Sequence, residues 1–132
     1  CFIGAMTKYR VSVLDALSEK FHVCRATGID LCKKNQIVKA SRYNLNIPQN
    51  PRWTNISPMR IISAARSGRI TLNISSHQKN NFPFMYTMNL SKLLSLTINE
   101  LDMLTKENMY VPSVPYRSCM GLEHFRVWSY EG

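Results

Sequence analysis

The chain has 132 residues, a net charge of +9, four cysteines and three histidines, and its length is that of one ordinary domain. No apolar run approaches the roughly 20 residues that span a bilayer, and no stretch has the layout of a signal peptide. The cysteines form no C-x-x-C pair and the histidines are not spaced to assist them, so no zinc site or disulfide framework is predicted. We therefore expect a cytoplasmic domain without a metal or a bound cofactor.

The positive charge is concentrated in the first half. Residues 1–69 contain twelve Lys or Arg against three acidic residues, a net +9, whereas residues 70–132 contain five of each. A one-sided basic field suggests an anionic ligand, a nucleic acid or an acidic membrane surface. The simpler alternative is a solvated face that only keeps the protein soluble.

Strand and helix signals alternate from the first residue. The run CFIGAM, residues 1–6, predicts a short buried strand that ends in a glycine turn. Residues 8–20 predict a helix with Thr7 as its N-cap. The near-alternation of residues 21–29 predicts a second strand that stops at Gly28.

The pattern continues with a helix and a third strand. Asp30 is expected to cap a short polar helix over residues 31–36, whose limits the weak apolar face does not define. Residues 43–47 alternate cleanly and predict a strand. A proline-rich loop, PQNPRWTN, then covers residues 48–55.

The most clearly bounded element is the third helix. Ser57 is a favoured N-cap residue, and Pro58 suits the first helical position because the missing N–H has no intrahelical partner there. Gly68 is expected to end the helix as a C′ residue with positive φ. Residues 69–75 follow as a fourth strand.

The second half gives weaker signals. Residues 85–89 predict a short fifth strand, and residues 91–104 are mostly helical in character. Thr97 and Glu100 form a T-x-x-E capping box, so the last helix is expected to begin at Thr97. The tail from Tyr110 has no clear period.

Strands that alternate with helices of about ten residues predict right-handed βαβ units around a parallel sheet. The predicted fold class is α/β, a Rossmann-like doubly wound parallel sheet with three α/β/α layers, in a single domain over residues 1–132. The chain begins at Cys1, with no cap or leader before its first apolar run. This start suggests one domain of a longer protein.

Ligands of doubly wound folds bind outside the carboxyl ends of the strands. Two predicted loops lie there, GAMTKYR (residues 4–10) and PQNPRWTNISPMR (residues 48–60), and each brings an arginine to a helix N-terminus. Backbone N–H groups and the helix dipole favour an anion at this position, and the guanidinium of Arg10 or Arg60 adds a bidentate clamp. The alternative is that both are ordinary surface arginines.

Other residues near these loops allow both a functional and a structural interpretation. Gly4 would permit close backbone approach to a ligand, although neither G-x-G-x-x-G nor the G-x-x-x-x-G-K-[ST] phosphate loop is present. Tyr9, Tyr43 and Trp53 are suited to stacking on a base, but aromatic residues at such positions are more often part of the core or its rim. His22 lies in a strand pattern, which favours a structural histidine over a catalytic one.

The runs FIGAMTKYRVSVLDALSEKFHV, IVKASRYNLNI and SPMRIISAARSG with RITLNIS resemble the C-terminal, donor-binding domain of GT-B glycosyltransferases. The likeness is to the bacterial spore-maturation (CgeB-like) and related glycosyltransferases, and it covers about residues 2–75. Those enzymes have a G-x-x-x-x-x-R loop after the first strand and roughly R-x-x-E-x-x-x-x-G before a later one.

The resemblance implies a Leloir transferase that moves a sugar from a nucleotide diphosphate donor, often without a metal. By this resemblance Gly4, Thr7, Lys8 and Arg10 would line the first donor loop, Ser57 and Arg60 would meet the diphosphate, and Tyr9, Trp53 and Ser63 would lie near the base or ribose.

Two departures limit the expected activity. The family's ribose-binding glutamate would fall at Ser63, which cannot make a bidentate ribose contact. The N-terminal domain that carries the acceptor site is not in this sequence. We therefore expect nucleotide-sugar binding by this chain, with no turnover by the chain alone. A non-enzymatic basic module that binds nucleic acid is the alternative, and peripheral contact with an anionic membrane is compatible with either.

Overall fold

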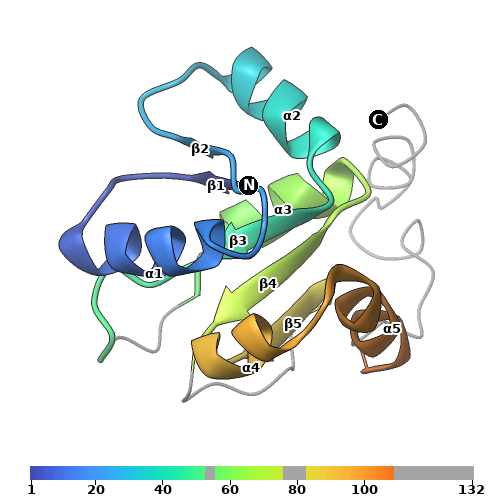
Figure 1. Cartoon of the computed structure of the whole chain (residues 1–132). Helices are drawn as coiled ribbons and strands as arrows, with labels where there is room; N and C mark the ends of the chain where they lie inside the picture. The colour runs from blue at the N-terminus through green and yellow to red at the C-terminus, as the bar shows by residue number, and fades with distance from the viewer. Residues whose placement is uncertain (53–55, 76–82, 109–132) are drawn as a thin grey trace.

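The computed structural model describes residues 1–52, 56–75 and 83–108 (Figure 1). Strands and helices alternate along most of this part of the chain. In chain order the elements are β1 (Phe2–Ile3), α1 (Lys8–Ser18), β2 (Arg25–Ala26), α2 (Leu31–Ala40), β3 (Tyr43–Asn46), α3 (Pro58–Arg66), β4 (Ile70–Ile74), β5 (Met85–Met88), α4 (Leu90–Ser95) and α5 (Ile98–Asn108).

Local signals at the helix ends explain where several helices begin. The side chains of Thr7 and Asp30 accept hydrogen bonds from the third residue of α1 and α2, as predicted. At the start of α5, the Thr97 N–H donates to the Glu100 carboxylate and the Glu100 N–H donates to the Thr97 hydroxyl, which confirms the capping box. Gly68 has φ of +72° directly after the C-cap of α3, which confirms its role as the C′ residue.

Three details differ from the sequence-based predictions. α2 extends to Ala40, four residues beyond the predicted segment, and buries Val38. The second strand is limited to Arg25–Ala26, so His22 lies outside it and is exposed. Ser57 stands at the N-cap position of α3, but its hydroxyl makes no capping bond.

All strand pairs are parallel. β1 pairs with β2, and β3, β4 and β5 pair in that order. Backbone bonds from Cys1 connect the two sheets: its amino group donates to the Tyr43 carbonyl at 2.7 Å, and its carbonyl accepts from the Leu45 N–H at 2.8 Å. β1 therefore lies beside β3, and the strands follow one another as β2, β1, β3, β4, β5. The fold is mixed α/β with parallel strands.

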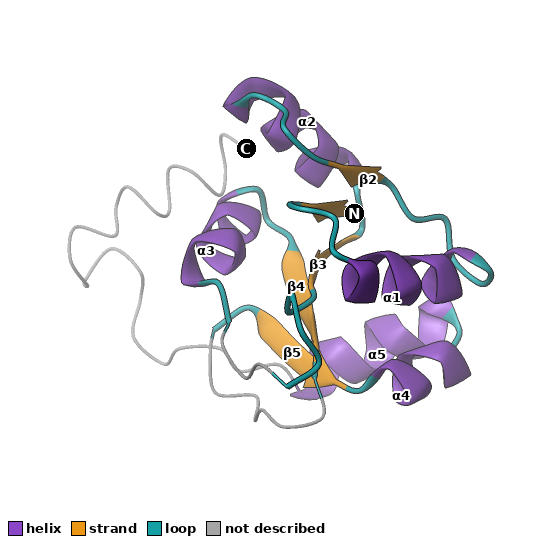
Figure 2. Cartoon of the chain, turned by 90° about the vertical axis from the view of Figure 1, so that its left-hand side faces the viewer, coloured by secondary structure: helices purple, strands orange, loops and turns teal. Residues whose placement is uncertain are grey.

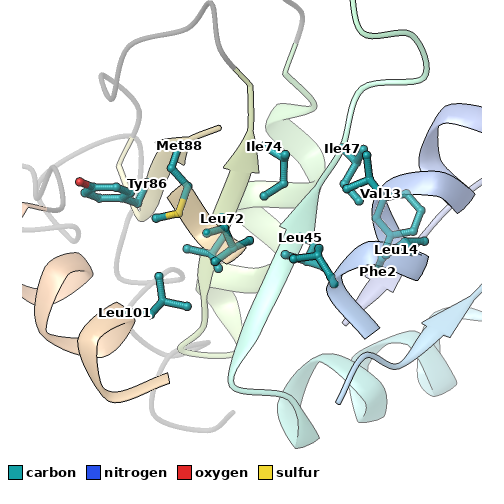
Figure 3. Close-up of a cluster of buried hydrophobic side chains, with 12 residues drawn as sticks. Phe2, Val13, Leu14, Leu45, Ile47, Leu72, Ile74, Tyr86, Met88 and Leu101 are labelled. Atoms are coloured by element: carbon teal, nitrogen blue, oxygen red, sulfur yellow. The ribbon is translucent and has the colours of Figure 1, made fainter. Parts of the chain in front are cut away.

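The two faces of the β3–β4–β5 sheet differ in chemistry. One face carries apolar side chains that pack with residues from α1, α4 and α5 into the main core (Figure 3). The other face lies towards α3, which Figure 2 shows on the opposite side of the sheet from α1. That second face carries Asn44, Asn46, Thr71 and Asn73, each at most 3% exposed. The alternation of strand side chains thus separates an apolar layer from a polar buried layer.

A polar contact attaches α5 to the amino end of β3. The Tyr43 hydroxyl donates to the Asp102 carboxylate, and Arg42 forms an ion pair with the same carboxylate at 2.8 Å. Burial first, and the hydrogen bond to Asp102 second, raise the pKa of Tyr43 to about 12. Tyr43 therefore lies at the opposite end of β3 from the predicted ligand loop, away from the base-stacking position considered for it.

Within the three described ranges, no helix is both long and apolar enough to cross a membrane.

Leu14→Ala tests the core. Leu14 is fully buried between α1 and the sheet, so the substitution should lower the free energy of unfolding by about 2–5 kcal/mol. Leu31→Ala is the matched control, because Leu31 is 69% exposed, and it should change the stability by less than about 0.5 kcal/mol. Urea unfolding of the three proteins measures both effects; equal losses in the two variants would contradict this core.

Tyr43→Phe tests the contact between β3 and α5. The folded-state pKa of about 12 lies above the unfolded value of about 10. The neutral hydroxyl therefore contributes stability that is complete below about pH 10 and is lost as the pH rises through 12. The melting temperature of the wild type should fall more steeply than that of Tyr43→Phe between these pH values. The same dependence of melting temperature on pH in both proteins would show that Tyr43 is not bonded to Asp102 as described.

Candidate anion site

Two loops meet at the carboxyl ends of β1 and β3. The first, residues 4–7, leads from β1 into α1, and the second, described over residues 47–52 and 56–57, connects β3 with α3. The hydrogen bonds of Cys1 place β1 beside β3, so the loops start from neighbouring strands. The Thr7 hydroxyl bridges them, because it caps α1 and also donates to the Gln49 carbonyl at 3.1 Å.

Arg10, in the first turn of α1, also connects the two loops. Its Nε donates to the Ile47 carbonyl at 2.9 Å and its Nη1 donates to the Ala5 carbonyl at 3.0 Å. The residue is only 7% exposed. Burial lowers its pKa, but an arginine remains charged at neutral pH. Arg10 is therefore a buried cation rather than the surface arginine of the alternative reading.

Arg60, in the first turn of α3, places its guanidinium close to that of Arg10. Its Nη1 donates to Asn46 Oδ1 at 2.8 Å and its Nη2 donates to the Ile3 carbonyl at 3.2 Å. Burial first, and the positive charge of Arg10 second, lower the pKa of Arg60 to about 10. Both causes reflect a cation held out of water and close to another cation.

The ring of Phe2 lies beneath both cations. The guanidinium carbons of Arg10 and Arg60 are 5.2 and 5.0 Å from the ring centroid, and Phe2 is fully buried. An aromatic ring attracts a guanidinium at this range and needs no charge of its own to do so. Phe2 thereby holds the two cations together without neutralising either.

No carboxylate balances this pair among the described residues. The ion pairs found there join Arg25 to Asp15 and Arg42 to Asp102, and neither involves Arg10 or Arg60. Each guanidinium has five N–H donors, of which two on each arginine reach protein acceptors. Buried charges are normally paired. Arg10 is buried and Arg60 is partly buried. Two neighbouring cations that have spare donors, and no carboxylate partner in the described part of the chain, are suited to a phosphate or carboxylate ligand.

Gly4 is necessary for this arrangement because of space. A Cβ at residue 4 would lie 2.8 Å from Nη2 of Arg60 and 3.3 Å from the Phe2 ring. The first distance is too short for a real contact, so a side chain here would displace the guanidinium. Gly4 thus gives space to the Arg60 guanidinium, and the predicted close approach of a ligand to its backbone stays a prediction.

The remaining predicted residues are at the site or near it, with different roles. Lys8 is exposed at the start of α1, and Ser57 precedes α3 with a hydroxyl that makes no cap bond. Ser63 is half-buried in the second turn of α3. Tyr9 packs against the hydrophobic core, which favours the core reading over base stacking. Trp53 lies outside the described residues.

Three further polar residues stand behind Arg60 and were not predicted from the sequence. The register places Asn46, Asn73 and Thr87 side by side on three strands. Asn46 Nδ2 donates to Asn73 Oδ1 at 2.8 Å, and Asn73 Nδ2 donates to Thr87 Oγ1 at 3.2 Å. The only available signal was asparagine within two strand patterns, which is unusual because strands are depleted in asparagine.

A separate cavity lies at the other end of the strands. It has a volume of about 400 Å³ and is lined mainly by apolar side chains, with Cys1, Cys24 and Tyr43 at the amino ends of the strands. Leu93 of α4 and Leu101 of α5 form part of its wall. None of the arginine-site residues lines it, so the cavity and the anion site are distinct.

Within the described ranges, no three His, Cys, Asp or Glu side chains are grouped as metal ligands would be.

No family model, no curated protein and no solved structure matches the chain. The likeness to GT-B donor domains therefore depends on the residues quoted above.

Gly4→Ala tests the contact with Arg60. The added methyl group should displace a flexible side-chain end rather than backbone, so we expect a small loss of stability and a clear shift in the NMR signals of the Arg60 guanidinium. The Arg60→Met background supplies the control: without the guanidinium, the stability cost of Gly4→Ala should shrink, giving a measurable coupling energy in the double-mutant cycle. Equal costs in both backgrounds would contradict the contact.

Proposed function

We propose that this chain is the donor-binding domain of a GT-B-type glycosyltransferase and that it binds the diphosphate of a nucleotide sugar. The supporting observation is the pair of acid-free guanidinium groups at the carboxyl ends of β1 and β3. A diphosphate carries the charge that two such cations require, and it offers several oxygens to their spare N–H donors.

We propose further that the fold is a Rossmann-like doubly wound sheet with three layers. The order β2, β1, β3, β4, β5 supports this, because it is one of the two common orders of that class. In such folds the ligand binds where successive connections leave on opposite faces of the sheet. β1 leads into α1 and β3 leads into α3 on the opposite side (Figure 2), and the arginine pair lies at this point.

The proposed chemistry is electrostatic. When a sugar leaves its nucleotide, negative charge develops on the departing diphosphate, and cations fixed beforehand stabilise that charge. Arg10 and Arg60 are already held by carbonyl and amide oxygens, so little reorganisation is needed. The acceptor site is assigned to a further domain, and this chain alone is proposed to bind without turnover.

Ligand-dependent melting tests the proposal. UDP or GDP at millimolar concentration should raise the melting temperature, by an amount that grows with ligand concentration, while the corresponding nucleoside should not. Arg60→Gln should abolish most of the shift, because it removes a charge and the N–H donors that face the ligand. A wild-type protein without any diphosphate-dependent shift would contradict the function.

A charge-matched variant separates this site from general basicity. Lys33→Gln, on the exposed surface of α2, removes one positive charge away from the arginine pair and should leave the diphosphate shift unchanged. The alternative, a nucleic-acid-binding module, makes the opposite prediction. Binding of an oligonucleotide would weaken steeply with salt and would depend on exposed lysines as much as on Arg60.

A further inference from the structure

We propose that Asn46 is a positioning and specificity residue of the anion site: a buried neutral amide that fixes the Arg60 guanidinium and leaves its charge for a ligand with at least two negative charges. The part of this inference that concerns the ligand rests on the proposed function. The part that concerns the position of Arg60 does not. Asn46 is 2% exposed, and its Oδ1 accepts from Arg60 Nη1 at 2.8 Å.

The orientation of the Asn46 amide follows from the hydrogen bonds alone. Arg60 can only donate, so the atom of Asn46 that meets it must be the oxygen. The Asn46 Nδ2 group then points along the sheet and donates to Asn73 Oδ1 at 2.8 Å, and Asn73 Nδ2 donates to Thr87 Oγ1 at 3.2 Å. With its oxygen bonded to Arg60, Asn46 gives its Nδ2–H to Asn73 Oδ1, so both ends of the amide are hydrogen-bonded and the side chain is restrained in this orientation. The Thr87 hydroxyl can accept or donate, so Arg60 is the group that sets the direction of the row.

The Asn46 side chain also differs from an aspartate in that it carries no charge. An aspartate has nearly the same shape and would present the same oxygen, but it would also supply the negative charge that Arg60 lacks. The site would then contain an internal ion pair and would attract an external anion less strongly. An amide gives the geometry of a carboxylate contact without the charge. Two cations in this state match a polyanion such as pyrophosphate better than a monoanion.

Asn46→Asp is the central experiment, with inorganic pyrophosphate as the probe and acetate as the monoanion. The variant should fold, with a melting temperature close to that of the wild type. Arg60 compensates the new carboxylate, and the Asn73 amide can turn to donate to it and to accept from the Thr87 hydroxyl, which replaces the lost bond from Asn46 Nδ2. Its affinity for pyrophosphate should fall by about tenfold or more, the equivalent of one lost charge-assisted interaction. Wild-type affinity in Asn46→Asp, or failure of this variant to fold, would overturn the proposal.

Asn44→Asp is the matched control. Asn44 lies on the same strand and is 3% exposed, but its amide donates to the Arg60 carbonyl at 3.5 Å and to Thr71 Oγ1 at 3.2 Å, not to the guanidinium. The Asn44 Oδ1 atom accepts from the Cys1 thiol at 3.9 Å, so a carboxylate there would not be hydrogen-bonded to a guanidinium. This variant should melt at a lower temperature than the wild type, yet retain pyrophosphate affinity within about threefold. An equal loss of affinity in both variants would show a general effect of buried charge and would count against Asn46.

Asn73→Leu tests the amide chain without touching Arg60. The Asn46 amide loses the acceptor of its Nδ2–H and is then held by its bond to Arg60 alone, so the Arg60 Nε–H signal in a ¹⁵N spectrum should show greater mobility than in the wild type. This readout needs no ligand, so it separates the two proposals. If the wild type binds no diphosphate but the Arg60 side chain is more mobile in Asn73→Leu than in the wild type, the proposed function is contradicted and the positioning role of Asn46 is supported. An unchanged Arg60 signal would remove the positioning role.

Discussion

The arrangement of the two loops depends on two like charges held around one aromatic ring. Arg10, which is buried, and Arg60, which is partly buried, both lie over Phe2, and in the described part of the chain their hydrogen bonds go to neutral oxygens rather than to carboxylates. A buried guanidinium is tolerated when its donors are occupied, and hydrogen bonds to charged groups are stronger than neutral ones. The carbonyls that accept these bonds belong to Ile3 at the end of β1, Ala5 in the loop that follows it and Ile47 directly after β3, so the cations also restrain the backbone around them.

The sheet register makes this burial possible. Because the strands are parallel and in register, Asn46, Asn73 and Thr87 fall on one row of one face. The same register places Leu45, Leu72 and Tyr86 on one row of the other face, within the hydrophobic core. A shift of one residue in β4 would exchange these two sets. The strand register that buries Leu72 in the apolar core also aligns the side chains of Asn46 and Asn73 behind Arg60. Packing of the core therefore fixes the position of this polar row as well.

Local features of this fold were predictable and non-local ones were not. Thr7, Asp30, Gly68 and the Thr97 capping box act within a few residues, so the sequence predicts the helix ends from short patterns. The partnership of Asn46 with Asn73 joins residues 27 positions apart, and it depends on a register that no local pattern contains. Arg10 and Arg60 were predicted in part. Their positions at two helix N-termini follow from the sequence pattern, but their contact with the Phe2 ring and the hydrogen-bond acceptors of Arg60 do not.

The separation of the two ends of the sheet has a consequence for stability and binding. At the amino end, Tyr43, Asp102 and Arg42 form a contact in which opposite charges are paired. At the carboxyl end, the hydrogen bonds of the two cations go to neutral groups in the described part of the chain. The first arrangement favours a fixed attachment of α5, whereas the second leaves two like charges close together without a carboxylate among the described residues. If the proposed diphosphate supplies the negative charge at the carboxyl end of β3, it would therefore also stabilise the two loops as it binds.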